Sequence, residues 1–231
     1  NYSIIIKKKN LIESVLSGVL FHGLYLGGVF YSISIGMPTS IAALIVTLQP
    51  ILTNILSGPI LNEKVTLKQW IGVLLGFFGA ALVLGLDLGS KIPLLGLVAT
   101  IIALISITAS TIWQKKLSNN LPLSVSNFYQ AVGGCFFHIL VVIFFTKPYI
   151  AFTKTFFLAM GHQILLVSFG AFTILMFLIK KNSASKTVSI FFLIPATSAL
   201  MAWFFLEESL TITDLLGFLI TSIGVYIATR D

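Results

Sequence analysis

Long apolar stretches separated by short polar connections run along the whole chain. Each is close to the roughly 20 residues that a helix needs to cross a membrane. The pattern predicts eight membrane-spanning helices, at Leu11 to Ile35, Ile41 to Leu61, Gln69 to Leu86, Leu94 to Trp113, Val125 to Phe145, Phe156 to Ile179, Val188 to Leu206, and Asp214 to Thr229. The connections leave no room for a separate soluble domain. We therefore expect an all-α polytopic membrane protein.

A set of five residues occurs twice, always 145 positions apart. Its members are Pro50, Glu63, Thr66, Gly72 and Gly79 in the first copy, and Pro195, Glu208, Thr211, Gly217 and Gly224 in the second. Internal repeats in an apolar chain are typical of transporters built from two related halves. We expect a first repeat over residues 1–91 and a second repeat over residues 92–231.

The composition supports a membrane protein, because 57% of the residues are hydrophobic and only 9% are charged. A soluble domain has roughly 25% charged residues. The net charge of +7 lies in the connections and not on one face, so we expect no binding to nucleic acid. The single cysteine, Cys135, excludes an internal disulfide and a multi-cysteine metal site, and we expect no metal and no cofactor.

The distribution of positive charge predicts the orientation. Eight spans place both ends of the chain on one side, and with a cytoplasmic N-terminus eleven cationic residues lie inside and three lie outside. Cytoplasmic loops are rich in Lys and Arg, so we expect both termini in the cytoplasm. The loops around Glu63 and Glu208 then lie on opposite sides, which makes the two repeats inverted.

The repeat also indicates that the first half is short. The second half begins near Ile92 and has five spans, whereas the first has three. We expect that the first repeat lacks its first two helices, which gives ten helices in the complete protein. A genuine eight-helix protein is the alternative.

The repeated motifs resemble the EamA family of the drug/metabolite transporter superfamily, whose fold is a ten-helix, five-plus-five inverted repeat. The motifs are Leu48-Gln49-Pro50, Glu63-Lys64-Val65-Thr66, Gln69-Trp70-Ile71-Gly72 with Gly79, and, in the second half, Leu193-Ile194-Pro195, Glu208, Leu210-Thr211, Gly217 and Gly224. The resemblance implies an exporter or exchanger of amino acids, metabolites or drugs in the bacterial inner membrane. It implies a central cavity bordered by the first, second, fourth, sixth and seventh spans.

Prolines and helix-end residues have distinct predicted roles. Pro50 and Pro195 interrupt the hydrogen bonds of their helices, so we interpret them as hinges or kinks for alternating access. Thr66 and Thr211 are predicted N-caps of the helices that follow. Glu63 and Glu208 are expected to stabilise the same amide ends through their charge, a structural role.

Glycines predict close helix packing. Gly72, Gly76 and Gly79 line one side of the third span, and Gly217 and Gly224 lie in the last. Small residues at such spacings let helices approach closely. Packing within the chain is favoured, and a homodimer contact is the alternative.

Polar residues inside spans are the candidates for a substrate cavity, because lipid penalises them unless they face protein or water. The candidates are His22, Tyr25, Gln49, Asn54, Ser110, Trp113 and Thr173. We expect the partners to be membrane lipid and a small-molecule substrate. Protons are a further hypothesis, with His22 as carrier; uncoupled exchange or facilitated diffusion is the alternative.

Two other classes of function are alternatives to a transporter. An intramembrane enzyme needs a nucleophile with a base, paired carboxylates or a metal cluster. The sequence has no HExxH or GxSxG motif, and its acidic residues lie at span ends or in loops. The second alternative is a truncated, non-transporting remnant of a transporter. The sequence favours a transporter.

Overall fold

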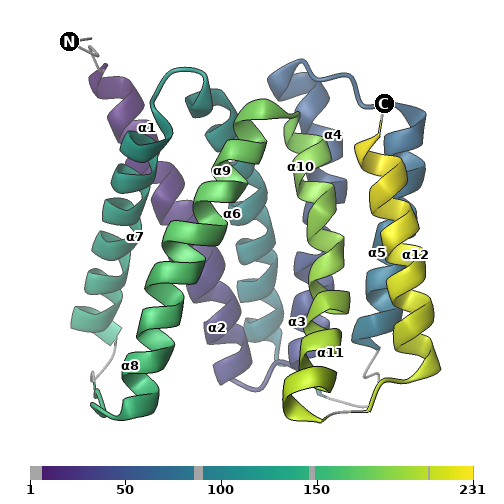
Figure 1. Ribbon diagram of the computed structural model, residues 1–231. Coiled ribbons are helices and arrows are strands. Elements are labelled where there is room, and N and C mark those ends of the chain that lie inside the picture. The colour runs from purple at the N-terminus through teal and green to yellow at the C-terminus, as the bar shows by residue number, and fades with distance from the viewer. Residues whose placement is uncertain (1–6, 86–90, 146–148, 208, 231) are drawn as a thin grey trace.

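The computed structural model describes residues 7–85, 91–145, 149–207 and 209–230. Within this part of the chain the regular structure is entirely helical, and eight helices are long and apolar enough to cross a membrane. This confirms the predicted all-α polytopic fold. The eight spans form one bundle, and the start of α1 and the end of α12 lie at the same end of it (Figure 1).

Several spans consist of more than one helical segment. The first four spans contain α1 (Lys8–Gly18), η1 (Val19–Leu26) and α2 (Gly27–Ser34); α3 (Thr39–Val46) and α4 (Gln49–Leu61); α5 (Leu67–Leu84); and α6 (Leu94–Ser118). The last four contain α7 (Leu123–Phe145); α8 (Lys154–Gly161), η2 (His162–Ala171) and α9 (Phe172–Lys181); α10 (Ala184–Ser189), η3 (Ile190–Phe192) and α11 (Leu193–Leu206); and α12 (Ile212–Thr229).

The repeat is visible in the backbone. Both α5 and α12 have 18 residues, and their first residues lie 145 positions apart. The residues that end α4 and α11, Asn62 and Glu207, have the same separation and are the only non-glycine residues with positive φ in the described part of the chain, at 56° and 57°. The ten-helix total and the division at residue 91 stay predictions.

The loops of the repeat place a capping box at the start of α5 and another at the start of α12. The Thr66 hydroxyl accepts from the Gln69 amide at 3.3 Å, and the Gln69 side chain accepts from the Thr66 amide at 2.7 Å. Thr211 and Asp214 make the same reciprocal pair. Each box satisfies backbone donors that a helix start leaves free. Glu208 lies outside the described residues.

Helices α5 and α12 run in opposite directions and pack closely over their glycine faces (Figure 1). A methyl group added to Gly224 would lie 2.4 Å from the backbone nitrogen of Gly76 and 2.7 Å from the carbonyl oxygen of Gly72. One added to Gly79 would lie 2.5 Å from the Thr221 nitrogen, and one added to Gly217 would meet Val83. Most of these contacts are with backbone atoms, which cannot move aside, so the two helices approach closely only because these positions are glycine.

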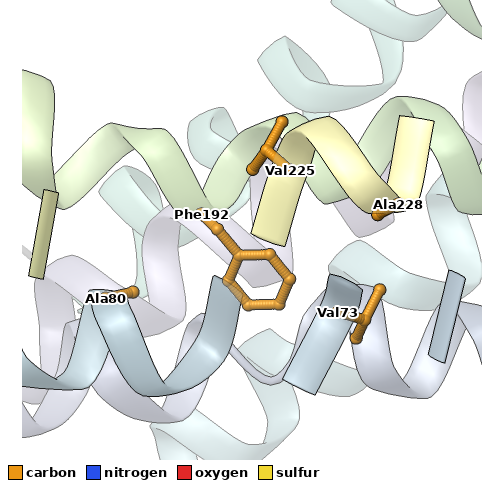
Figure 2. Close-up of a cluster of buried hydrophobic side chains, with 5 residues drawn as sticks. All are labelled: Val73, Ala80, Phe192, Val225 and Ala228. Atoms are coloured by element: carbon orange, nitrogen blue, oxygen red, sulfur yellow. The ribbon is translucent and has the colours of Figure 1, made fainter. Parts of the chain in front are cut away.

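A buried apolar cluster joins this helix pair to the rest of the second half. Figure 2 shows the Phe192 ring between α5, which carries Val73 and Ala80, and α12, which carries Val225 and Ala228. The ring lies against Gly76, where an added methyl group would be 2.6 Å from it. Phe192 is fully buried and belongs to η3, so the α5–α12 pair holds the 3-10 segment of the seventh span in place.

Candidate functional site

A cavity of about 580 Å³ lies among the first, second, sixth and seventh spans, with one contribution from α6. Its lining is mainly apolar and aromatic. The polar lining residues are His22, Tyr25, Thr39, Thr47, Gln49, Gln163 and Ser168. Within the described part of the chain, none of the lining residues is Asp, Glu, Lys or Arg. Its size falls in the range of sites for small organic molecules, roughly 300–1,000 Å³.

Four spans lose regular α-helical geometry, and all four do so beside this cavity. The first and sixth spans contain the π-helical segments η1 and η2, which end at Leu26 and Ala171, 145 residues apart. The second span breaks at Thr47–Leu48, and the seventh contains the 3-10 segment η3. Short π and 3-10 segments often mark functional sites and hinges. Two irregular segments from each half therefore surround one cavity.

Both prolines line the cavity directly after these irregular segments. Pro50 lies in the first turn of α4, after the break at Thr47–Leu48, and Pro195 lies in the first turn of α11, after η3. A proline in a first helical turn lacks an amide that would have no intrahelical partner anyway, so it is tolerated there. The two prolines thus fix where a new helix begins in the middle of a span.

An aromatic cluster joins η1 to α9 at the cavity wall. The rings of Phe21 and Phe172 are 5.1 Å apart, those of His22 and Phe172 are 5.0 Å apart, and those of Phe21 and Tyr25 are 5.6 Å apart. These separations are typical of attractive ring contacts. Tyr25 and His22 reach the cavity from this cluster.

Three of the seven cavity candidates line the cavity: His22, Tyr25 and Gln49. Gln49 is 2% exposed, and its amide nitrogen donates to the Thr111 hydroxyl of α6 at 3.0 Å. This hydrogen bond holds the cavity-lining part of the second span against α6, the fourth span.

The other four candidates lie elsewhere. Ser110 belongs to a buried polar network between α1, α6 and α7, where it bonds to Ser17 and accepts from Gln114, which in turn donates to Gln130. Trp113 is half-buried and is not among the lining residues. Ser110 therefore faces the first and fifth spans, and neither Ser110 nor Trp113 lines this cavity.

Thr173 is exposed on the outside of the bundle, whereas its neighbour Phe172 is buried and lines the cavity. The reason is η2. A π segment bonds residue i to i+5 and has more residues per turn, so the positions that follow it are rotated from a stripe drawn at α-helical spacing. The residues missed by sequence, such as Phe172, Phe191 and Val167, are apolar and give no signal that separates a cavity wall from a lipid-facing surface.

Asn54 lies one turn beyond Pro50 in α4 and is not among the residues that line the cavity. Its side-chain oxygen accepts from the Ser185 hydroxyl of α10, and both residues are buried. Nearer the bundle end, the Glu63 carboxylate accepts from the backbone amides of Ala184 at 2.9 Å and Ser185 at 3.4 Å. The expected partner of Glu63, the amide end of α5, is therefore wrong: Thr66 and Gln69 occupy that end, and Glu63 binds the start of α10 in the other half.

Among the described residues that line the cavity, His22 and Tyr25 are the only ones with a titratable side chain. In the described ranges there is no group of three or more His, Cys, Asp or Glu side chains placed to hold a metal ion. Apolar membrane-crossing helices around an uncharged cavity, with breaks at matched depths, are the architecture of a membrane transporter for small molecules.

Comparison with known proteins gives the family. The chain matches the EamA-like transporter family over residues 2–85 and 94–230, and it belongs to this family. The protein named uncharacterized transporter YvbV of Bacillus subtilis (strain 168) is 28% identical over 221 residues, which cover 91% of this chain and 68% of that protein. The probable amino-acid metabolite efflux pump of Escherichia coli (strain K12) is 24% identical, and the match covers 86% of this chain and 70% of the efflux pump.

A solved crystal structure has the same fold. It superposes on this protein with a TM-score of 0.76 at 15% sequence identity, and the match covers 95% of this chain and 86% of the solved chain. The chain is thus an integral membrane protein of the EamA-like transporter family.

Proposed function

We propose that this protein carries a small organic metabolite, amino-acid-like solute or drug across the membrane by alternating access, as an exporter or exchanger. The observation that carries the proposal is the coincidence of the cavity with four irregular helix segments, two from each half. Helix breaks at membrane depth are tolerated where they face protein or a wet cavity, and paired breaks let one half move against the other.

The lining favours a neutral or zwitterionic solute, or a lipophilic cation. The cavity offers aromatic rings, the hydroxyl groups of two threonines and the amides of Gln49 and Gln163. None of the described residues that line it is Asp, Glu, Lys or Arg. A phosphorylated substrate would need buried cationic partners. The efflux of amino-acid metabolites named for the Escherichia coli relative is compatible with this substrate class.

In this proposal the contacts between α4, its following loop and α10 form the inner gate. The Asn54–Ser185 bond and the contact of Glu63 with α10 join the two halves beyond the prolines. Opening toward the gate end of the bundle requires both contacts to break, and the breaks beside Pro50 and Pro195 supply positions at which the helices bend. The excess of cationic residues at that end supports a cytoplasmic location for the gate and for both termini, in a bacterial inner membrane.

The test is flux in proteoliposomes. Purified 231-residue chain is reconstituted and loaded with a panel of labelled amino acids, amino-acid derivatives and lipophilic cations, with and without a pH gradient. We expect saturable flux of at least one neutral or zwitterionic solute, with self-competition. Acceleration by the pH gradient would support proton coupling, with His22 as candidate carrier, and indifference to it would support uncoupled exchange.

A version that includes upstream coding sequence is measured in parallel. Flux only in the longer version would identify the 231-residue chain as a non-transporting remnant. Absence of flux in both, with folded protein verified by circular dichroism, contradicts the transport proposal.

A further inference from the structure

A second cavity, of about 600 Å³, lies at the end of the bundle that carries the start of α5 and the end of α12. We propose that it binds the phosphate headgroup of an anionic phospholipid. The lining residues used here are Glu63, Lys64, Lys68, Lys186 and Arg230, with Thr66 at the cap of α5.

The pocket has a positive balance of charge, because four cationic side chains face one carboxylate. The carboxylate of Glu63 is already engaged by the backbone amides of Ala184 and Ser185. Within the described part of the chain, no carboxylate lies at ion-pair distance from Lys64, Lys68 or Arg230. Cationic groups that share a pocket without a bound anion repel one another, so an anion bound there lowers their electrostatic energy.

The backbone adds two donors. In α5 the first two residues after the cap, Leu67 and Lys68, have amides without an acceptor among the described residues, since the Thr66 hydroxyl serves the Gln69 amide. The α5 helix has 18 residues, and the partial positive charge at its start favours an anion. Side-chain cations and free amides thus point to the same kind of ligand, a phosphate group.

The position of the pocket favours a lipid as the source of that phosphate. Leu67 lines the pocket and is 76% exposed, at the first residue of an apolar membrane-crossing helix. Arg230 follows the last residue of α12, and its guanidinium lies 4.7 Å from the centre of the exposed Tyr226 ring. An apolar surface directly beside a basic pocket suits a molecule with an acyl chain and an anionic head.

The pocket is built by both halves of the chain. Glu63, Lys64 and Lys68 come from the first half, whereas Lys186 and Arg230 come from the second. A headgroup held between them favours the arrangement in which the Glu63 carboxylate contacts the start of α10. Anionic lipid is therefore expected to stabilise the conformation described here over one in which that end is open.

The experiment measures lipid binding directly. The purified 231-residue chain in detergent is titrated with short-chain phosphatidylglycerol or with phosphatidylcholine of the same chain length, and bound lipid is counted by native mass spectrometry. The variant Lys64→Gln/Lys68→Gln/Arg230→Gln removes three pocket charges. The matched control Lys7→Gln/Lys8→Gln/Lys9→Gln removes three exposed charges from the same end of the bundle, outside the pocket.

We expect phosphatidylglycerol to bind more tightly than phosphatidylcholine. The pocket variant should weaken phosphatidylglycerol binding by about tenfold or more, whereas the control variant should bind within about twofold of the parent chain. The three single variants are measured as well, so that a triple variant that does not fold leaves the test intact; each is expected to weaken binding by roughly threefold. Equal losses in pocket and control variants, or no loss in either, overturn the proposal. Inorganic phosphate is titrated as a further arm: tight binding of free phosphate in the pocket, with no preference for phosphatidylglycerol, overturns the lipid as the source.

Discussion

The carboxylate of Glu63, at the end of the second span, accepts a hydrogen bond of 2.9 Å from the backbone amide of Ala184, which begins the seventh span. The two residues are 121 positions apart. One side chain thus joins α10 to the loop that follows α4.

Removing this carboxylate is expected to destabilise the protein. Glu63→Ala leaves the first amides of α10 without their acceptor, and we expect a loss of about 2 kcal/mol in the free energy of unfolding. The measurement is unfolding in detergent followed by circular dichroism. The control is Glu13→Ala, whose carboxylate pairs with the exposed Lys9 at 3.8 Å and should cost under about 0.5 kcal/mol. Equal losses would contradict a special role for Glu63.

Accessibility of Ser185 reports whether the proposed gate opens. The chain has one cysteine, Cys135, which is replaced by serine before Ser185→Cys is introduced. Because Ser185 is 1% exposed, a membrane-impermeant maleimide should label the new cysteine slowly. Adding Glu63→Ala, or a transported solute that favours the open state, should raise the labelling rate. Rapid labelling without either would show that this end is not closed.

Close packing of α5 on α12 predicts intolerance to a single methyl group. In Gly224→Ala the new carbon would lie 2.4 Å from a backbone nitrogen, so the helices must separate, at a cost of about 1–3 kcal/mol. Gly161→Ala is the matched control, since nothing lies within 4 Å of an added methyl group there and the backbone is helical. The difference in unfolding midpoint between the two variants checks the prediction.

Cavity contacts predict which substitutions alter transport. Tyr25→Ala removes an aromatic wall and should raise KM by roughly tenfold for the solute identified in proteoliposomes. Thr173→Ala changes a side chain exposed on the outside of the bundle and should leave KM unchanged. If both variants raise KM alike, the cavity is not the substrate site.

The prolines are expected to control turnover more than binding. Pro50→Ala and Pro195→Ala each restore an amide that lets α-helix continue through the break, which should lower the maximal rate by about three- to tenfold with little change in KM. Pro59→Ala, in the same helix as Pro50 but away from the cavity, is the control. An unchanged rate in the Pro50→Ala/Pro195→Ala double variant would remove the hinge interpretation.

The fold could be predicted from sequence because lipid imposes a simple rule: about 20 consecutive apolar residues for each crossing. The eight predicted spans agree with the eight candidate membrane spans found among the described residues, with ends that differ by a few residues. The family could be predicted too, since the motifs around Pro50 and Glu63 occur twice at a constant separation.

The residues that line the cavity and the partner of Glu63 were harder to predict from the sequence, for two physical reasons. Helical stripes assume 3.6 residues per turn, and the π segments break that assumption, so the sixth span presents Phe172 and not Thr173 to the cavity. Long-range partners are the second reason. Glu63 precedes the start of α5 by a few residues, yet it bonds to α10, a choice made by the packing of the two halves and invisible in local sequence.

The glycine contact between α5 and α12 has a property of symmetric dimers. Gly72 meets Ala228, and Gly217 meets Val83; adding 145 to Gly72 and to Val83 gives Gly217 and Ala228, so the two contacts are equivalent with their members exchanged. The surface is therefore self-complementary, as in a two-fold interface, although one chain supplies both sides. Each of these glycine contacts has an equivalent made by different residues 145 positions away. A substitution at one glycine can therefore be repeated at its equivalent, and comparing the two variants separates the effect of helix geometry from the effect of the neighbouring residues.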